Sequence, residues 1–402
     1  MRLTKDHSTE GAPYIIENVF EALNKPGQWY LDRSQGCLYY LPLPGEKLNE
    51  CQVVAPYLDT LVRFDGQVEA EGLKVENVIF RNLNFAHNEW PVPEDFAGSA
   101  QASMGVPAAI RLQAVRNCLF QNCQFSHLGT YGVGLEKDCH DIRLVRCRLS
   151  DLGAGGVRIW HGCCRNVVAD CEIGDGGILY PSAVGVLVGN ASGNQIIHNH
   201  IYNFFYTGIS VGWTWGYQES HTYGNIIEYN HIHDLGHGRL SDMGGVYLLG
   251  VQVGTRVRYN LIHDVTCRDY GGWALYTDEG SSYILLENNI CYRTNRELFH
   301  QHYGQENIVR NNIFVFGGQQ MLRYSRIEPH TGVIFERNIV VSRGQAMWSG
   351  DYGGETRQIK SDWNLYWDVE NSEPVLNAGD DGTRRSLKEW QALGFDRHSL
   401  IA

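Results

Sequence analysis

The sequence predicts an all-β protein built mainly as a right-handed parallel β-helix, a solenoid whose coils each contain three short strands. Short β-rich runs, separated by Gly, Asn and Asp, end on an apolar residue every 23 to 31 residues. In most repeats an Asn or Cys precedes this residue by two positions. A content of 45 glycines with 43% hydrophobic residues provides many turns around a continuous core. The closing residues are Phe125, Leu149, Ile173, Ile201, Ile232, Ile262, Ile290, Ile313, Ile339 and Leu365.

The Asn and Cys residues at the common register are expected to be structural. Like residues of stacked coils lie about 4.8 Å apart, so side-chain amides can bond along the column. The eleven cysteines include no CxxC pair and no zinc spacing, which predicts free, buried thiols. The recurrent pairs His233/Asp234 and His263/Asp264 are interpreted as turn-formers. The expected column contains Cys123, Cys147, Cys171, Asn199, Asn230, Asn260, Asn288 and Asn311.

The chain is expected to have three parts. Residues 1–66 contain PGQWYLDRSQGCLYYLPLPGE, in which Trp/Tyr strands and Gly/Pro turns predict a small β subdomain leading into the first coil. Residues 67–370 form the predicted β-helix, with an aperiodic Pro/Gly/Ala-rich insertion at about 88–107 that predicts a functional or covering loop. Residues 371–402 are a polar tail with a short capping helix, for which Ser386 is the expected N-cap and Glu389 lies three residues on.

Charge and hydropathy argue against several classes of partner. The net charge of −12, from 33 basic and 45 acidic residues, argues against nucleic acid and favours a neutral ligand. No stretch approaches the roughly 18 apolar residues that a membrane span requires. The opening residues MRLTKDHSTE lack the apolar core of a signal peptide, so the sequence as given predicts a cytoplasmic location. No motif requires a cofactor or a metal ion, and the pattern makes no prediction of oligomeric state.

One outward face of the coils carries side chains that the scaffold does not need. The strands that follow the closing residues include TGISVGWTWG, SDMGGVYLLG, GGWALYTDEGSS and ELFHQHYG. Aligning their apolar alternation brings acidic, aromatic and imidazole groups of adjacent coils to one edge. These residues are His161, Trp213, Trp215, Asp242, Asp278, Glu279, His300, His302, Arg323, Arg326 and Asp351, with Trp273 and Tyr303 nearby.

This set matches the needs of glycosidic bond cleavage. The reaction uses one carboxyl group as proton donor and a second as nucleophile or as base for water. Asp242 and Asp278 lie one coil apart, and adjacent coils can hold two carboxylates at the roughly 5 to 9 Å used by retaining and inverting enzymes. Spacing alone leaves that stereochemical choice open. The Trp and Tyr rings offer faces for stacking on sugars, and His302 and Arg326 could bind hydroxyl groups.

The same runs carry a resemblance to a known family. SDMGGVYLLG, YNLIHDV, GGWALYTDEGSSYILLENNICY and FHQHYGQENIVRNNIF, together with PGQWYLD and LYYLP, resemble the β-helix glycoside hydrolases of family 141 and the related family 120. The resemblance covers most of residues 14–370 and implies a pectate-lyase-like solenoid that hydrolyses xylan, xylosides or fucosylated pectin side chains. It implies Asp242 and Asp278 as the catalytic pair, with Glu279 as the alternative acid. Members are often secreted and carry further N- and C-terminal segments, so we expect a fragment or a shortened relative.

Two other functions remain open. A polysaccharide lyase could use the same scaffold, but it needs a base and a cation or Arg to neutralise a uronate. The face offers Arg323 and Arg326 but no obvious Lys. A non-catalytic carbohydrate-binding β-helix would use the Trp face for binding, with the acids only lining it.

Overall fold

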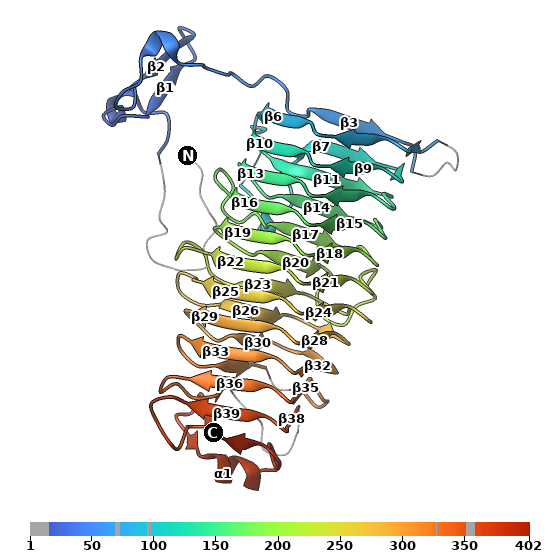
Figure 1. Ribbon diagram of the computed structural model, residues 1–402, viewed down its shortest axis with the longest axis vertical. Helices are drawn as coiled ribbons and strands as arrows, with labels where there is room; N and C mark the ends of the chain where they lie inside the picture. Colours follow the sequence, from blue (N-terminus) through green and yellow to red (C-terminus); the bar gives the residue numbers. More distant parts are fainter. Residues whose placement is uncertain (1–15, 69–72, 95, 97, 327, 351–357) are drawn as a thin grey trace.

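The computed structural model describes residues 16–68, 73–94, 96, 98–326, 328–350 and 358–402. Three long sheets wrap around one axis and give the elongated right-handed parallel β-helix that the sequence predicts (Figure 1). Each coil passes through the three sheets in a constant order, as in β12, β13 and β14. Successive coils pair in parallel, so residues at equal positions of neighbouring coils lie one above another.

The three sheets are named here after their first strands. The β5 sheet contains β5 (Ile79–Arg81), β9 (Leu119–Gln121), β12 (Arg143–Val145), β15 (Val167–Ala169), β18 (Gln195–Ile197), β21 (Ile226–Glu228), β24 (Arg256–Arg258), β28 (Leu285–Glu287), β32 (Asn307–Arg310), β35 (Val333–Glu336) and β38 (Ile359–Asp362). The β6 sheet contains β6 (Asn84–Asn88), β10 (Gln124–Leu128), β13 (Arg148–Leu152), β16 (Glu172–Gly176), β19 (His200–Phe204), β22 (His231–Leu235), β25 (Leu261–Val265), β29 (Ile290–Thr294), β33 (Ile313–Gly317), β36 (Ile339–Ser342), β39 (Leu365–Asp368) and β42 (Leu400–Ile401). The β3 sheet contains β3 (Val62–Asp65), β7 (Ala108–Gln113), β11 (Tyr131–Lys137), β14 (Val157–Trp160), β17 (Val186–Gly189), β20 (Ile209–Gly212), β23 (Met243–Leu248), β26 (Gly272–Thr277), β30 (Phe299–Gln301), β34 (Leu322–Tyr324), β37 (Trp348–Ser349), β40 (Asn377–Ala378) and β41 (Arg384–Arg385).

The predicted register is correct in the first coils and wrong by one residue in the later ones. Ile262 pairs with Cys291, not with Ile290, and Cys291 pairs with Phe314. The inward column therefore continues through Cys291, Phe314, Val340 and Tyr366, whereas Ile290, Ile313, Ile339 and Leu365 point outward. Each of the four sites has two adjacent apolar residues, and the 2-residue period of a strand allows only one to face the core.

The ladder shifts with the register. Asn289 and Asn312 carry the column, whereas the predicted members Asn288 and Asn311 adopt left-handed turns at φ 56° and 54°. Each ladder amide donates to the next Asn side chain and to a carbonyl of the preceding coil, as Asn230 does to Asn260 and to Ile196. Cys171 connects the thiols to the amides, because its backbone N–H donates to Asn199.

The eleven cysteines are free thiols, as predicted, but the prediction of burial is correct for only eight of them, since Cys37 is exposed and Cys51 and Cys164 are partly exposed. The interpretation of the His-Asp pairs as turn-formers is correct for their acidic members, since Asp234 and Asp264 adopt left-handed φ of 52° and 55°. It is wrong for His233 and His263, which lie in β22 and β25 and stack at 4.9 Å on the outer face of the β6 sheet. The alternation of the strand turns these rings outward, because the adjacent Ile232 and Ile262 face the core.

Smaller elements accompany the coils. β1 (Trp29–Asp32) and β2 (Cys37–Tyr40) form an antiparallel hairpin apart from the main stack (Figure 1). β4 (Val75–Glu76) pairs with β8 (Val115–Arg116), and β27 (Ser281–Ser282) pairs with β31 (Gly304–Gln305). Short 3-10 helices cover Phe20–Ala22, Leu48–Glu50 and Gln101–Ser103.

The C-terminal segment covers the last coil. Helix α1 (Leu387–Ala392) begins with a capping box between Ser386 and Glu389 at the residues where the sequence predicts it. Trp390 of this helix is fully buried, and β42 adds a last strand to the β6 sheet. Within the described parts of the chain, no helix is long and apolar enough to cross a membrane.

Candidate active site

Adjacent strands of the β3 sheet position two carboxylates. β23 begins one residue after Asp242, and β26 ends one residue before Asp278. Asp242 adopts a left-handed φ of 59°, which Asp tolerates better than most residues. Gly271 permits the close approach of the next coil, since its φ is 72° and a Cβ there would lie 2.8 Å from the Cα of Asp242. The DMGG turn thus presents Asp242 beside the coil that carries Asp278.

Three tyrosine hydroxyl groups surround the two acids. Tyr247 donates to Oδ2 of Asp278 over 2.6 Å, and Tyr276 donates to Oδ1 of Asp242 over 3.0 Å. The side chain of Tyr276 also acts to lower the pKa of Asp278. Tyr206 donates to the backbone carbonyl of Asp242 over 2.7 Å. Each of the two carboxyl groups thus accepts a hydrogen bond from a buried tyrosine of the β3 sheet.

The environment of Asp278 favours the protonated form. Its side chain is buried, with 8% exposure. Burial raises the pKa of the carboxyl above its ordinary value, although hydrogen bonds from Tyr247, Tyr276 and the amide of Glu279 and the charge of His302 act in the opposite direction. A carboxyl group with a raised pKa holds its proton at a higher pH than an exposed Asp and can donate it.

Glu279 points to a different neighbour from Asp278. Its carboxylate accepts a hydrogen bond from Tyr303 over 3.2 Å, and the guanidinium of Arg326 lies 3.9 Å from the centre of the Tyr303 ring. Asp278, by contrast, accepts a hydrogen bond from Tyr247, so the pair of acids held by buried tyrosines is Asp242 and Asp278.

Two imidazoles border the acids. His300 is buried and stacks on Tyr276 with ring centres 5.1 Å apart. Burial and the charge of Arg323 lower the pKa of His300 well below its ordinary value, so this ring is neutral at pH 7. Nε2 of His300 and Nδ1 of His302 lie 2.8 and 2.9 Å from the Ser325 hydroxyl, which holds both rings.

The tryptophans differ in exposure, and this corrects part of the predicted stacking surface. Trp213 and Trp273 are buried, with exposures of 4% and 3%. Trp213 packs against Trp215, and Trp273 packs against His300 and donates to Glu297. Neighbouring side chains cover the ring faces of both tryptophans, so these residues pack beneath the site and offer no stacking surface to a ligand. Trp215, with 45% exposure, keeps a ring face available to a ligand.

The remaining predicted residues lie at the margins. His161 is exposed after β14, three coils before β23, or about 14 Å along the axis. Arg323 lies beside His300 in register and contacts Asp380 at 3.5 Å. Arg326 is exposed above Tyr303. Asp351 lies outside the described residues.

The insertion at 88–107 reaches the site from the N-terminal side. Arg158 donates to the carbonyls of Met104 and Val106, and this fixes the insertion on the outer face of the β3 sheet. Gln101 donates to the hydroxyl of Tyr206 over 3.3 Å. The insertion therefore contacts the phenol that holds the backbone of Asp242.

Sequence reasoning did not identify several residues of the site. The sequence pattern assigns no role to Tyr247 and Tyr276, although both alternate with inward residues as Asp278 does. The available signal was the two-residue spacing of Tyr276 and Asp278 in YTD, which places both side chains on one face of the strand. Tyr247 occupies the position of Tyr276 in the preceding coil. The missed residues are Gln101, Tyr206, Tyr247, Tyr276, Glu297 and Ser325.

Comparisons with known proteins agree with the fold. A family model described as a right-handed beta helix region matches residues 65–188 and 108–264. No curated protein matches the sequence. A solved structure named as a glycoside hydrolase has a TM-score of 0.60 and 22% identity, and the match covers 73% of this chain and 56% of the other.

More distant similarities are also present among solved structures. The GH136 lacto-N-biosidase from Eubacterium ramulus has a TM-score of 0.47 and 12% identity, covering 74% of this chain and 62% of the other. PfbA, a surface adhesin of Streptococcus pneumoniae, has a TM-score of 0.45 and 10% identity, covering 80% of each chain. These similarities concern the fold alone, and the chain spans little more than half of the first glycoside hydrolase. The resemblance to family 141 stays a prediction.

Proposed function

We propose that the protein is a glycoside hydrolase that cleaves oligo- or polysaccharides with Asp278 as general acid and Asp242 as nucleophile. The observation that carries the proposal is the pair of carboxyl groups on adjacent coils, of which Asp242 accepts a hydrogen bond from Tyr276 and Asp278 accepts one from Tyr247. The buried Asp278 has the raised pKa that a proton donor needs, and Asp242 is half-buried at the edge of the site. The similarity to a solved glycoside hydrolase indicates which reaction to test first.

We propose a retaining mechanism, because the strands of adjacent coils lie about 4.8 Å apart. Retaining enzymes place their carboxyl groups about 5 to 5.5 Å apart, whereas inverting enzymes need about 6.5 to 9.5 Å to admit a water molecule. Asp242 would then attack the anomeric carbon while Asp278 protonates the leaving oxygen. Water would release the sugar from Asp242 after Asp278 removes its proton.

The surroundings suit a neutral glycan. The net charge of −12 disfavours a polyanionic substrate, and the exposed Trp215 offers a stacking face. Tyr270, with 46% exposure, lies next to the buried Trp273 and could supply a second face. From the sequence resemblance, we propose xylan, β-xylosides or α-L-fucosides as the first substrates to test.

The test compares leaving groups in two variants. Wild type, Asp278→Asn and Asp242→Asn are assayed on xylan, nitrophenyl and dinitrophenyl glycosides of xylose and fucose. Removing the acid should reduce kcat/KM on poor leaving groups by about 10²- to 10⁴-fold but much less on dinitrophenyl glycosides, which leave without protonation. Asp242→Asn should lose activity on every substrate because the covalent step is lost.

Asp175→Asn is the matched control, since Asp175 lies on the β6 sheet, away from the site. It should retain wild-type turnover. NMR of the first-formed sugar should show the substrate's anomeric configuration. Near wild-type turnover by Asp278→Asn on xylan or by Asp242→Asn on any substrate would refute the assignment. An unsaturated product from pectate or alginate would instead establish a lyase, and glycan binding without release would establish a binding protein.

A further inference from the structure

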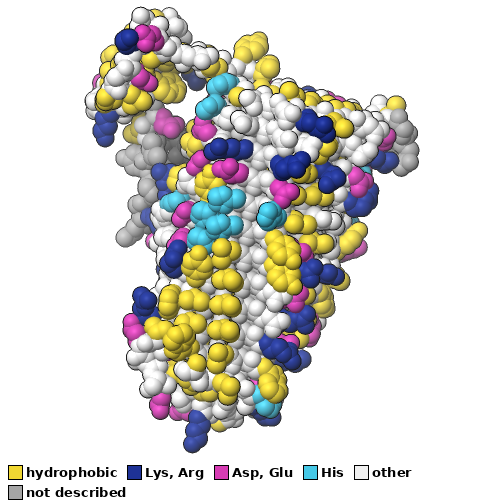
Figure 2. All heavy atoms as spheres, viewed as in Figure 1, with side chains coloured by type: hydrophobic (Ala, Val, Ile, Leu, Met, Phe, Trp, Pro, Cys, Tyr) yellow, Lys and Arg dark blue, Asp and Glu magenta, His cyan; other side chains and the backbone are white. Residues whose placement is uncertain are grey.

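A second chemically unusual cluster lies on the β6 sheet. His200 of β19 pairs in register with His231 of β22, and His233 of β22 pairs with His263 of β25. His231 and His233 are two residues apart, so both point outward from the same strand. Figure 2 shows histidines gathered at one level of this elongated face, with rows of apolar side chains toward the C-terminal end. Four imidazoles of three consecutive coils thus meet on a sheet that carries none of the proposed catalytic residues.

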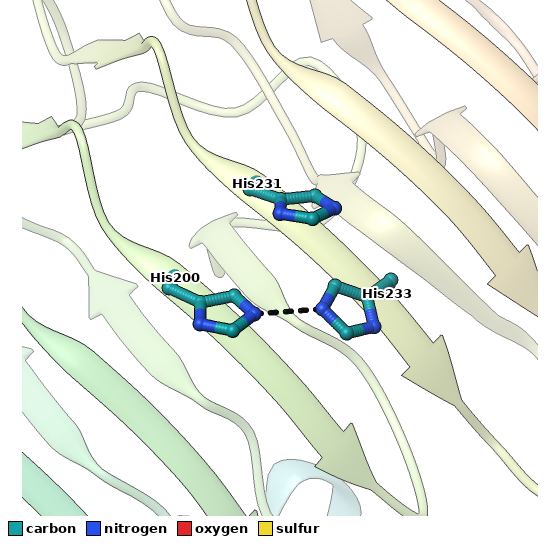
Figure 3. Close-up of side chains that lie close together, drawn as sticks. All are labelled: His200, His231 and His233. Carbon is teal, nitrogen blue, oxygen red and sulfur yellow. Dashed lines mark hydrogen bonds between the residues drawn. The ribbon is translucent and has the colours of Figure 1, made fainter.

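The ring nitrogens converge in a way that stacking alone does not require. Nε2 of His200 lies 2.7 Å from Nε2 of His233 (Figure 3). One ring nitrogen each of His200, His231 and His233 lies within 4.8 Å of the other two. Among the described residues, this is the one group of three or more potential ligand side chains whose ligand atoms lie this close together. Nε2 of His200 and Nε2 of His233 face one another as two ligands of one cation would, whereas Nε2 of His231 lies 2.8 Å from Nε2 of His263 and its ring must rotate to join them.

A neighbouring carboxylate favours the tautomer of His233 that metal binding needs. Oδ2 of Asp234 lies 2.9 Å from Nδ1 of His233. A proton on Nδ1 of His233 can donate to this carboxylate and leaves the lone pair on Nε2, the atom that faces His200. Neutral imidazole is the form that coordinates a metal ion.

We propose that His200, His231 and His233 bind a divalent transition-metal ion, for which Zn²⁺ is the test ion. An all-imidazole ligand set suits zinc, nickel or copper, whereas calcium and magnesium prefer oxygen ligands. Zn–N bonds of about 2.0 to 2.1 Å in tetrahedral geometry need ligand nitrogens about 3.3 Å apart. The His200 and His233 rings must therefore separate by about half an ångström, which the exposed His200 side chain permits. The three ligands come from two coils, and water can occupy the fourth position.

The competing explanation is an aromatic column without a metal. His233 stacks on Tyr202 at 5.7 Å and on His263 at 4.9 Å, and His263 stacks on Tyr292 at 4.5 Å. Such a column explains the parallel rings of these four residues. His200 and His231 form a second stacked pair with ring centres 5.2 Å apart, and their Nε2 atoms lie 2.7 Å from Nε2 of His233 and 2.8 Å from Nε2 of His263, respectively. Hydrogen bonds between imidazoles are therefore the alternative to a bound metal ion. Metal titration separates the two explanations.

The experiment uses the untagged full chain after treatment with a chelator. Calorimetric titration with Zn²⁺ should show one ion bound per chain, and Co²⁺ should give the visible absorption of a tetrahedral complex. His200→Gln and His233→Gln should each weaken Zn²⁺ binding at least tenfold. Asp234→Asn should weaken it about 10- to 100-fold, the usual effect of removing a carboxylate behind a ligand. Zn²⁺ should raise the Tm of wild type but not that of His233→Gln.

His127→Gln is the matched control. His127 also stacks on an imidazole, that of His87, and pairs with the carboxylate of Asp151, but it lies outside the trio. Its Zn²⁺ affinity should equal that of wild type. The proposal is overturned if wild type binds no Zn²⁺, or if the His200 and His233 variants bind it as tightly as wild type. If a His variant fails to fold, Asp234→Asn tests the proposal in its place, and an unchanged Zn²⁺ affinity of that variant would likewise overturn it. Failure of the glycosidase assignment would leave this result unchanged, because the readout is metal binding.

Discussion

Replacing Tyr247 by Phe tests the electrostatic account of the proposed acid. The phenol is 2% exposed and donates to Asp278 over 2.6 Å, and burial keeps its own pKa well above the ordinary value, so it remains a donor. A hydrogen bond to a charged group contributes about 1.5 to 3 kcal/mol. Since this bond stabilises the carboxylate, its loss should raise the pKa of Asp278 by about 1 to 2 units, at 1.36 kcal/mol per unit.

The assay is the pH dependence of kcat/KM on a nitrophenyl glycoside. A general acid is active while protonated, so activity is lost as pH rises through its pKa. A higher pKa in Tyr247→Phe should therefore move the alkaline limb up by about 1 to 2 units. The control is Tyr40→Phe, which removes an equally short 2.6 Å bond to Glu46 in the distant hairpin and should leave the profile unchanged. An alkaline limb that stays in place or moves to lower pH in Tyr247→Phe would refute the reasoning.

Three further predictions concern stability and binding. Asn230→Leu should lower the free energy of unfolding by about 3 to 5 kcal/mol in urea titrations, because buried ladder groups lose their partners; a loss under about 1 kcal/mol would contradict this. Asp264 has its pKa lowered to about 2, mainly by hydrogen bonds from Arg293, so its contribution is present above the unfolded pKa of about 4 and is lost as pH falls toward 2. Because its side chain is 32% exposed, Asp264→Asn should cost about 1 kcal/mol at pH 7, and a difference that does not shrink on acidification would be inconsistent with this account. Trp215→Ala should raise KM about three- to tenfold with kcat unchanged, unlike the control Trp363→Ala, and an unchanged KM would exclude stacking there.

The candidate site was predictable only in part. That Asp242 and Asp278 lie on adjacent coils could be predicted, because Asp242 precedes one recognisable strand and Asp278 follows the next, and these two strands pair in the stack. The tyrosine hydroxyls could not be assigned, since a Tyr in an apolar strand fits either packing or hydrogen bonding. Trp213 and Trp215 share a two-residue spacing, yet one is buried and the other exposed. The left-handed φ of Trp213 interrupts the strand geometry from which equal exposure was expected.

By itself, the sequence determined the repeating coil. Stacked parallel strands are the arrangement in which the Asn and Cys side chains can form a ladder while the regularly spaced apolar residues face one core. Tertiary structure decided between alternatives that the sequence pattern fits equally well. Where Ile290 and Cys291 adjoin, either could face the core, and only pairing with Ile262 selected Cys291. Strand register likewise brought Nε2 of His200 to 2.7 Å from Nε2 of His233, because the coils differ in length and only the pairing of β19 with β22 decides which side chains meet.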